Sequence, residues 1–517
     1  MNDKQQVTQA AALVMVAFAA SRVLGLVRQM VFGVYFGTGA AMDTYTAAQR
    51  VPEALFLVIA GGALGSAFIP TFAARLAQHD TADAWKLASA VTNLLMLIVL
   101  PITLICIVIA PWLVRVIIAP AFPPASQLET ANLMRVMLLS TIIFGASGIV
   151  MGALNAHQHF LLPAVAPILY NVALIGGAVV GGVTPLGPMG PALGMVVGSL
   201  AHLLIQVPGL LRYRARYTFT LGRGDPGVRE VGLLMAPRVM GMAAQQLNFI
   251  VSNNLASRLG PGAVSTLDYA WRVMMLPEGV FAQAVGTAAF PTFAAQAARR
   301  EFAQMRETLA ATLKTIIAIT LPATVGLIAV GQPIIALMFQ RGEFDAASTR
   351  SVAWALAFFA LGLIGHSGLE ILSRAFYALH DTWTPALIAI VNLLCNVTLG
   401  ILLPPVFRNV GWPPHAGLAL ANALAVLVEG GALLALIHRR VGSMRGYGLP
   451  RQLGRVALAS TGMALALGAW RALAPDAVLI QSLGGVLLGG LVYLGLAHLL
   501  DIHEIHQLIH SLLTRNR

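Results

Sequence analysis

The chain has 517 residues, of which 58% are hydrophobic and 10% are charged, and its formal net charge is +12. Soluble domains carry roughly 25% charged residues, so this composition excludes an ordinary soluble protein and indicates a membrane protein that crosses the bilayer many times. The two cysteines, Cys106 and Cys395, lie inside apolar stretches and exclude a framework of disulfides.

Apolar windows that can cross a membrane recur along the whole chain. A transmembrane helix needs about 20 predominantly apolar residues. Fourteen such windows are predicted, at 10–36, 46–77, 88–119, 133–156, 161–183, 190–212, 231–257, 266–297, 309–338, 352–378, 384–404, 416–438, 452–473 and 477–499. The first apolar run has no small-residue cleavage site after it, so we expect a retained helix. The predicted fold is an all-α integral membrane protein with 14 transmembrane helices.

The basic residues of the loops gather on one side of the membrane. With a cytoplasmic N-terminus, that side holds Lys86 and the arginine-rich segments 212–229, 299–306, 439–451 and 515–517. The positive-inside rule therefore places both termini in the cytoplasm. This asymmetry accounts for most of the net charge, so nucleic-acid binding is not expected.

An internal repeat relates the two halves of the chain. The segments MDTYTAAQRVPEALF and LDYAWRVMMLPEGVF align four residue pairs at one constant separation: Asp43 with Asp268, Pro52 with Pro277, Glu53 with Glu278, and Phe56 with Phe281. The segment PTFAA also occurs twice, at 70 and at 291. Each repeat holds an even number of windows, which predicts two six-helix lobes related by a parallel pseudo-twofold axis.

The repeat predicts four parts of the chain. These are an N-terminal lobe at 1–222, a C-terminal lobe at 223–445, two additional transmembrane helices at 446–500 and a tail at 501–517. Isoleucine and leucine recur at helical spacing in the tail, which predicts an amphipathic helix on the cytoplasmic membrane surface. Two lobes that face each other suggest a central cavity and transport by alternating access.

Four arginines lie in the first two windows of each lobe: Arg22, Arg28, Arg50 and Arg272. An arginine at the bilayer centre costs about 3 kcal/mol on insertion scales. Intramembrane acids are few, so an anionic ligand is expected to neutralise some of these charges, and the planar guanidinium suits phosphate. Two alternatives stay open: Arg28 can snorkel to the interface, and Arg22 can form an internal ion pair.

Two features of these helices favour bending. Arg22 and Arg28 are rotated by roughly 120° from one another on an ideal helix, so we predict a bend at Gly25 that turns them toward one ligand. Pro52 and Pro277 occupy equivalent positions of the second and eighth windows, and each removes a backbone hydrogen bond. These kinks support a rocking motion, with a kink of no functional role as the alternative.

Four segments carry a resemblance to a known family. They are ASRVLGLVRQ, FGTGAAMDTYTAAQRVPEALF, GGALGSAFIPTFAA and YAWRVMMLPEGVFAQAVGTAAFP, and they resemble the MurJ (MviN) family of lipid II flippases, within the multidrug/oligosaccharidyl-lipid/polysaccharide exporter superfamily. The resemblance covers the whole chain. It implies transfer of lipid II, the undecaprenyl-diphosphate-linked peptidoglycan precursor, from the cytoplasmic to the outer leaflet of the bacterial inner membrane.

The resemblance also implies roles for particular residues. The residues implied to bind the diphosphate and sugar are Ser21, Arg22, Arg28, Arg50 and Arg272. The resemblance also falls on Gly25 and Asp43, which join the helix-bending Pro52 and Pro277 as the residues expected to act in gating. The two additional helices at 446–500 are implied to form a groove for the lipid tail.

Sodium is the one candidate cofactor. Some members of the family bind it with aspartates between the seventh, eleventh and twelfth spans. Here the eleventh window offers Asn392 and Asn396, and the seventh offers Gln245, Gln246 and Asn248. A site without carboxylates binds the ion weakly, so membrane potential is the alternative driving force.

Three other functions are alternatives: a flippase for another glycan, an antiporter and an enzyme. A flippase for another polyprenyl-diphosphate-linked glycan fits the arginines equally well, whereas a cation or multidrug antiporter needs acidic or aromatic residues in the cavity. An enzyme needs a general base, paired acids or a metal site. The histidines of the short loops are His157, His159 and His380. Apart from Asp381 beside His380, no neighbouring acid has the spacing of a metal ligand, so we expect a transporter and not an enzyme. The expected partners are lipid II, membrane lipids and the cell-wall synthesis machinery, and the chain is expected to be a monomer.

Overall fold

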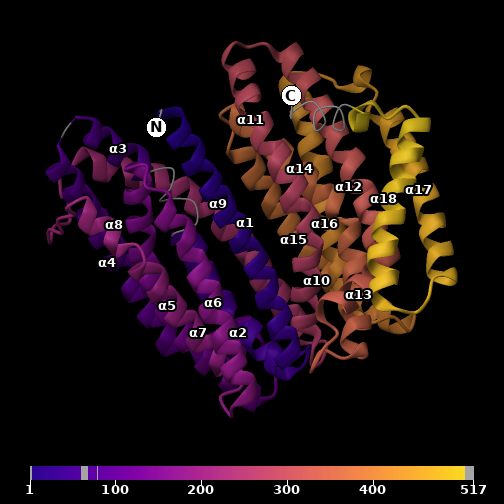
Figure 1. Ribbon diagram of the computed structural model, residues 1–517, viewed down its shortest axis with the longest axis horizontal. Helices are drawn as coiled ribbons and strands as arrows, with labels where there is room; N and C mark the ends of the chain where they lie inside the picture. Colours follow the sequence, from indigo (N-terminus) through magenta and orange to yellow (C-terminus); the bar gives the residue numbers. More distant parts are fainter. Residues whose placement is uncertain (1–2, 60–67, 79, 507–517) are drawn as a thin grey trace. The chain divides into compact units, whose positions relative to one another are not determined.

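The computed structural model describes residues 3–59, 68–78 and 80–506 (Figure 1). Within these ranges all regular secondary structure is helical, which confirms the predicted all-α membrane fold. The chain divides into two compact units, Met1–Ser265 with Arg341–Phe344 and Thr266–Gln340 with Asp345–Arg517. The first unit includes the seventh predicted span, which the repeat assigns to the second lobe. The lobe boundaries at 222 and 445 stay a prediction.

The helices of the first unit follow the order of the windows. They are α1 (Asp3–Phe36), α2 (Ala40–Ile59), α3 (Ile69–Ala77), α4 (Thr81–Leu113), the π-helix η2 (Val114–Ile118), α5 (Pro124–Ala156), α6 (Leu161–Val183), α7 (Met189–Leu204), α8 (Val207–Arg212) and α9 (Pro226–Ser257). The next helix, α10 (Ala263–Pro277), begins in this unit and continues into the second.

The second unit contains the remaining helices. They are η3 (Glu278–Ala282), α11 (Gln283–Ala298), α12 (Phe302–Phe339), α13 (Ala346–Leu361), α14 (Leu363–Ala378), α15 (Trp383–Asn409), α16 (Pro414–Val441), η4 (Arg445–Tyr447), α17 (Leu449–Leu473), η5 (Ile480–Gly484) and α18 (Gly485–Leu499). Of the short elements, η3 and η5 are π-helical and η4 is a 3₁₀-helix.

Eleven helices among the described residues are long and apolar enough to span a membrane, or twelve if the bent pair α13 and α14 forms one span. Each overlaps a predicted window. Two windows are not among them. In the window 46–77, residues 60–67 lie outside the described residues, and the window 231–257 forms α9, a helix of 32 residues that is less apolar. The count of fourteen therefore stays a prediction.

Three helices begin at an aspartate that caps them. Asp80 at α4 and Asp345 at α13 each accept a hydrogen bond from the N–H three residues on, at 2.8 and 2.7 Å. Asp225 accepts one from the N–H of Gly227 at 2.8 Å, and Pro226 follows it as the first residue of α9. Each carboxylate pairs an N–H that the first helical turn leaves without an intrahelical partner. These side chains define where the three helices start.

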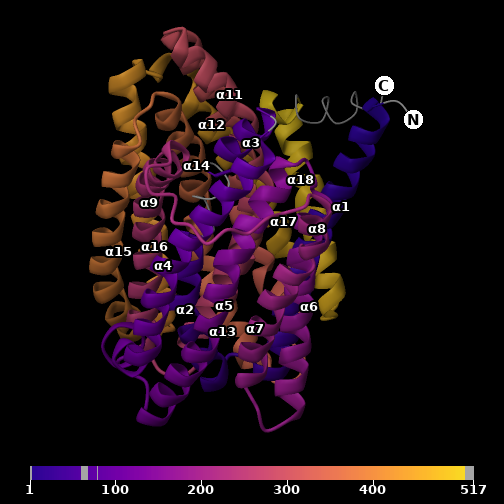
Figure 2. The same cartoon turned by 90° about the vertical axis from the view of Figure 1, so that its left-hand side faces the viewer.

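The backbones of α6 and α7 lie in direct contact, and the two helices run side by side in Figure 2. A Cβ atom added at Gly177 would lie 2.5 Å from the carbonyl oxygen of Gly190, and one added at Gly190 would lie 2.5 Å from the Cα of Gly181. At Gly194 it would lie 2.7 Å from the carbonyl oxygen of Ala173. Glycines four residues apart on both helices therefore allow the close approach that is typical of membrane helix pairs.

The two helices predicted as an addition, α17 and α18, pack against each other and against α12 (Figure 1). Val456 and Met463 of α17 share one buried cluster with Tyr493 of α18, and the Tyr493 hydroxyl donates a hydrogen bond to the carbonyl of Ala318 in α12. Leu465 is exposed on the outer face of the pair. Exposed leucines are compatible with lipid contact, and the groove for a lipid tail stays a prediction.

The predicted amphipathic tail is described only at its start. Ile502 and Ile505 are buried in the cluster of α17 and α18. These two isoleucines therefore pack against protein and do not face the membrane surface. Residues 507–517 lie outside the described residues.

Candidate functional site

Arg28 and Ser21 of α1 contact the same residue of α6. Arg28 Nη1 donates a hydrogen bond to Asn171 Oδ1 at 3.1 Å. Asn171 Nδ2 in turn donates to the carbonyl oxygens of Ser21, at 3.4 Å, and of Pro167, at 3.0 Å. Asn171 is only 7% exposed, so its amide holds a fixed orientation. Arg28 thus points to a neighbouring helix, which favours a protein-facing arginine over the snorkelling alternative.

Arg22 lies on an exposed face of α1. The Arg22 side chain makes no hydrogen bond or ion pair with the residues that the structure describes. The helix continues through Gly25, where an added Cβ would meet no atom within 4 Å. Packing therefore does not require glycine at this position, and the bend at Gly25 stays a prediction.

Arg50 of α2 reaches across to α9. Its Nε donates a hydrogen bond to Asn253 Oδ1 at 3.5 Å, and its guanidinium carbon lies 5.7 Å from the ring centroid of Phe249. Asn253 is fixed in turn, because its Nδ2 donates to the carbonyl of Ile118 at 3.0 Å. Glu53, one turn on, places a carboxylate oxygen 3.7 Å from Arg50 Nη1. The amide and the ring orient the guanidinium, and Glu53 partly offsets its charge.

Asp43, in the first turn of α2, binds the start of α10. Its carboxylate accepts hydrogen bonds from the N–H of Gly262 at 2.6 Å and from the N–H and the hydroxyl of Ser265, both at 2.7 Å. Gly262 has a φ of +85°, and an added Cβ there would lie 2.2 Å from the carbonyl oxygen of Thr38, so the position requires glycine. Asp43 is 2% exposed. It connects two segments of the first unit that are far apart in the sequence.

Arg272 belongs to the second unit and pairs with a residue of its own helix. Its Nε donates a hydrogen bond to Asp268 Oδ2 at 2.6 Å, one turn earlier on α10. The Arg272 side chain stays 30% exposed, whereas that of Asp268 is 6% exposed. The helix ends at Pro277, and the π-helical turn η3 follows. Pro52, by contrast, lies inside α2, which continues to Ile59.

Arg374, another arginine within a predicted span, was not among the predicted site residues. Its guanidinium binds the carboxylate of Glu370 one turn earlier on α14, and its Nη1 donates to the hydroxyl of Thr287 in α11 at 2.9 Å. The side chains of Arg374 and Glu370 are 24% and 29% exposed. An acid and an arginine four residues apart are a recognisable helical pair, so the pattern was present in the sequence.

Asn392 and Asn396 of α15 are both buried, at 6% and 5% exposure. Asn392 is hydrogen-bonded to the carboxylate of Glu429 in α16, which is itself 6% exposed. The expectation that no carboxylate accompanies these two amides is therefore wrong. Glu429 is the single acid of the window 416–438, and the close packing of α15 on α16 brings it to Asn392.

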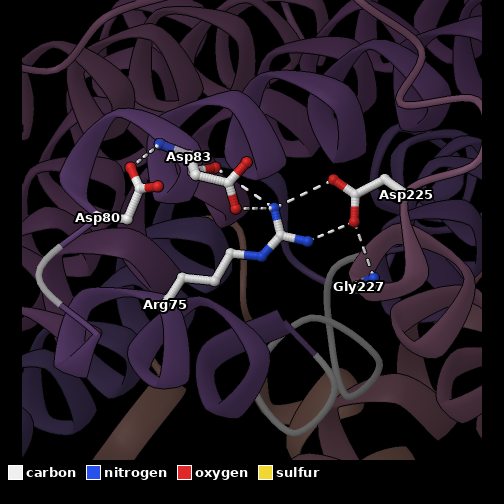
Figure 3. A network of polar contacts seen from close by, with 5 residues as sticks. All are labelled: Arg75, Asp80, Asp83, Asp225 and Gly227. Carbon is white, nitrogen blue, oxygen red and sulfur yellow. Dashed lines mark hydrogen bonds and ion pairs between the residues drawn. The ribbon is translucent and has the colours of Figure 1, made fainter.

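A further cluster of charge joins α3, α4 and α9 (Figure 3). Arg75 binds Asp225 through both terminal nitrogens and Asp83 through Nη1 at 2.9 Å. An added Cβ at Gly227 would lie 2.5 Å from Arg75 Nη2, so glycine leaves space for the guanidinium. The hydrogen bonds from Arg75 hold the pKa of the Asp225 carboxyl below its ordinary value. Asp225 thus caps α9 and fastens it to α3.

Of the predicted binding residues, Ser21 and Arg28 share a partner, Asn171. Arg28 and Arg50 are each held by an asparagine of another helix, Asn171 and Asn253, and these partners were missed. Both asparagines are polar residues inside apolar windows, which is a visible signal, but their partners depend on which helix faces meet. Arg272 lies in the other unit.

Comparisons with known proteins agree with this geometry. The family model described as lipid II flippase MurJ matches residues 32–481. A probable lipid II flippase MurJ of Bdellovibrio bacteriovorus is 30% identical over 525 residues, which cover 98% of each chain. The lipid II flippase MurJ of Burkholderia cenocepacia is 30% identical over 433 residues, which cover 81% of each chain.

Solved structures share the fold. A structure of the lipid II flippase MurJ in an inward closed conformation matches with a TM-score of 0.79 and 26% identity, and the match covers 94% of this chain and 98% of that one. An inward-facing multidrug resistance MATE transporter of the MOP superfamily matches with a TM-score of 0.68 at 16% identity and shows the fold alone. The family model covers most of the chain, and the relatives match at nearly full length, so the resemblance of the four segments is confirmed. The chain belongs to the MurJ family of lipid II flippases.

Proposed function

We propose that this chain flips lipid II from the cytoplasmic to the outer leaflet of the bacterial inner membrane by alternating access. The names of its relatives support the substrate. The excess of arginine in alternate loops supports a cytoplasmic position for both termini. In this proposal the chain works as a monomer, with the cell-wall synthesis machinery as a partner.

The observation that carries the proposal is Arg22. Its side chain is exposed on a membrane-spanning helix and has no polar partner among the described residues. A guanidinium in that place is costly unless it faces water or an anion. A diphosphate supplies paired oxygens that match the guanidinium fork. A cation or multidrug antiporter needs acidic or aromatic residues to hold cations, so an arginine at this position argues against that alternative.

The other arginines extend the proposed site. Arg28 and Arg50 are oriented by amides of neighbouring helices, and Glu53 offsets part of the charge of Arg50. In this proposal Ser21 and these arginines bind the diphosphate and sugar, and Arg272 is a further ligand. The side chain of Arg272 is 30% exposed and can exchange Asp268 for a phosphate oxygen.

Four residues are proposed to permit the change of state: Gly25, Asp43, Pro52 and Pro277. Proline removes a backbone hydrogen bond from a helix and lowers the cost of bending it. The π-helical turn after Pro277 supports such a point in α10. Asp43, with three hydrogen bonds to Gly262 and Ser265, supports a contact that holds one state until it is broken.

We also propose sodium as the coupling ion, at Asn392, Asn396 and Glu429. Sodium is a hard cation and takes oxygen ligands, and this set offers two amide oxygens and one carboxylate. All three side chains are at least nine-tenths buried. A bound sodium ion would neutralise the carboxylate within the membrane. The donor set therefore fits the ion.

The test of the transport proposal is lipid II movement in liposomes, followed with a reagent that reaches one leaflet. Charge-assisted hydrogen bonds contribute roughly 1.5–3 kcal/mol each. Arg22→Ala is therefore expected to abolish transport and Arg22→Lys to slow it tenfold or more, while Arg408→Ala, at an exposed arginine of α15, transports normally. Folded protein is measured beside each rate. A loss of folded protein in proportion to activity would make Arg22 structural, and chemical conversion of lipid II would indicate an enzyme.

The sodium proposal has its own test. Transport by the wild type is expected to be faster in sodium than in choline, and Glu429→Gln is expected to lose this difference, because it removes the charged ligand. Glu307→Gln, at an exposed acid of α12, serves as the control. Equal wild-type rates in both salts, with a dependence on membrane potential, would leave the potential as the driving force.

A further inference from the structure

The chain turns back on itself where α18 ends. Asp501 has a φ of +51°, in the left-handed region that aspartate tolerates better than most residues. Its N–H donates to the carbonyl of His498 at 3.2 Å, and the N–H of Ile502 donates to that of Ala497 at 2.9 Å. Arg455 of α17 donates to the carbonyl of Asp501 at 3.0 Å. These bonds close the helix and direct the next residues back along its last turn.

Burial fixes the residues that follow the turn. Ile502 is 0% exposed and Ile505 is 6% exposed, and both pack in the cluster formed by α17, α18 and α12. Between them Glu504 accepts a hydrogen bond from Gln452 of α17. The segment is therefore held at three points, and His506 lies beside His498, the one histidine of α18.

Four side chains with metal-ligating atoms meet at this turn. A carboxylate oxygen of Asp501 and one ring nitrogen each of His503 and His506 lie within 4.8 Å of one another. His498 Nδ1 lies 2.7 Å from His506 Nε2, and His503 Nδ1 lies 3.3 Å from Asp501 Oδ1. The sequence pattern is His-x₂-Asp-x-His-x₂-His. Two imidazoles and one carboxylate thus lie close together, and His498 adds a third imidazole beside that of His506.

We propose that His498, Asp501, His503 and His506 form a binding site for a divalent transition-metal ion, with zinc as the ion that fits best. Imidazole nitrogens select zinc and its neighbours over magnesium and calcium, which prefer oxygen ligands. Tetrahedral zinc takes four such ligands at about 2.0–2.2 Å. The Asp501 and His503 side chains are 66% and 74% exposed, so both can rotate to close around the ion.

The charges around the cluster agree with a cation. Asp501 supplies one negative charge, and the three histidines bind the ion as neutral imidazoles. Arg455 contacts the main-chain carbonyl of Asp501 and leaves its carboxylate available. A bound ion would join the last turn of α18 to the segment that leads into the tail. The site is independent of the residues proposed to bind lipid II, so its test and the transport test fail separately.

The proposal is tested by zinc titration of the purified full-length protein, carried without a histidine affinity tag. Isothermal calorimetry is expected to give one zinc ion per chain, and cobalt is expected to give the visible absorption of a tetrahedral site. His503→Ala and His506→Ala each remove a ligand and are expected to weaken binding by more than tenfold. His380→Ala changes an exposed histidine in the loop between α14 and α15 and is expected to bind as the wild type does.

Folding is checked separately. The mutated side chains are exposed or half-exposed, so the variants are expected to melt with the wild type in the presence of EDTA. With added zinc, only the wild type and His380→Ala are expected to gain thermal stability. The proposal is overturned if the wild type binds no zinc at micromolar concentration, if the two ligand variants bind as well as the wild type, or if His380→Ala loses binding to the same degree.

Discussion

The arginines of the two units are held in different ways. In the first unit, Arg28 and Arg50 are bound by asparagine side chains from other helices. In the second unit, Arg272 and Arg374 are each bound by an acid one turn earlier on the same helix. An amide orients a guanidinium and leaves its charge, whereas a carboxylate orients it and cancels the charge. In the first unit, helix packing therefore fixes Arg28 and Arg50, and Glu53 offsets part of the charge of Arg50. In the second unit, each of the two arginines forms an ion pair that a single helix can make alone.

The largest effect is expected at Arg272. Its substitution tests whether an arginine that is paired with an acid also binds the diphosphate. Arg272→Ala should abolish growth of a strain depleted of its flippase, at normal membrane levels, because the exposed guanidinium is needed for the diphosphate. Arg350→Ala, an exposed arginine of α13, is the control. Normal growth with Arg272→Ala would remove the second unit from the site. If Arg272→Ala instead lowers the protein level in the membrane, and adding Asp268→Asn to that variant restores the level, the ion pair is structural.

The second prediction replaces the asparagine partner of an arginine in the first unit by an acid, which is the kind of partner that the arginines of the second unit have. Asn171→Asp places a carboxylate beside Arg28, so the new ion pair should offset the lost amide donors and leave the melting temperature close to that of the wild type. Transport of lipid II is expected to fall tenfold or more, because the charge is cancelled. Asn171→Leu separates the two effects, since it removes the amide without adding charge and should lower stability by about 1–3 kcal/mol. Transport by Asn171→Asp at the wild-type rate would show that an acid partner at Arg28 does not impair the site, against the comparison of the two units.

The third prediction concerns an ion pair of the first unit whose acid comes from another element. Asp225→Asn keeps the cap of α9 but loses the charge that binds Arg75, and should cost roughly 1–2 kcal/mol after solvent screening. The pKa of Asp225 is lowered in the folded protein. Its contribution is therefore complete above the unfolded value of about 3.9 and is lost as the pH falls through the lower folded value.

The measurement is thermal unfolding of both proteins between neutral and acid pH. The two melting temperatures should differ at pH 7 and converge in acid. Asp80→Asn, at a cap that the Arg75 guanidinium does not bind, is the control. A constant difference at all pH values would show that the charge of Asp225 is not the cause.

The smallest effect is expected for an acid of the second unit. Glu370→Gln leaves Arg374 with the hydroxyl of Thr287 and removes a partly exposed pair within one helix. Such pairs contribute about 0.2–0.5 kcal/mol, so the melting temperature should change little. Transport should stay near that of the wild type. A large loss of stability in denaturant unfolding would mean that own-helix pairs are as important as the contacts between helices.

Much of the fold could be predicted because it depends on local composition. The window 161–183 coincides with α6, because an unbroken apolar run of that length is typical of a transmembrane helix. The prolines and the spacing of Asp268 and Arg272 are equally local. These features need no knowledge of which helices are neighbours.

The partners of the site residues could not be predicted in the same way. Asn171 lies 143 residues from Arg28, and their meeting depends on the faces that α1 and α6 turn toward each other. Glu429 was missed because one acid barely changes the apolar average of its window, although its position beside Asn392 decides what the pair can bind. Contacts between helices follow from packing, which the apolar windows do not encode.

The glycine contact between α6 and α7 has a mechanical consequence. Where two backbones touch, no flexible side chains lie between them that could repack, so the helices cannot slide past each other without collision. We therefore expect α6 and α7 to move together as a rigid body. Asn171 lies on α6 and holds Arg28, so we expect a displacement of the helix pair to shift the Arg28 guanidinium.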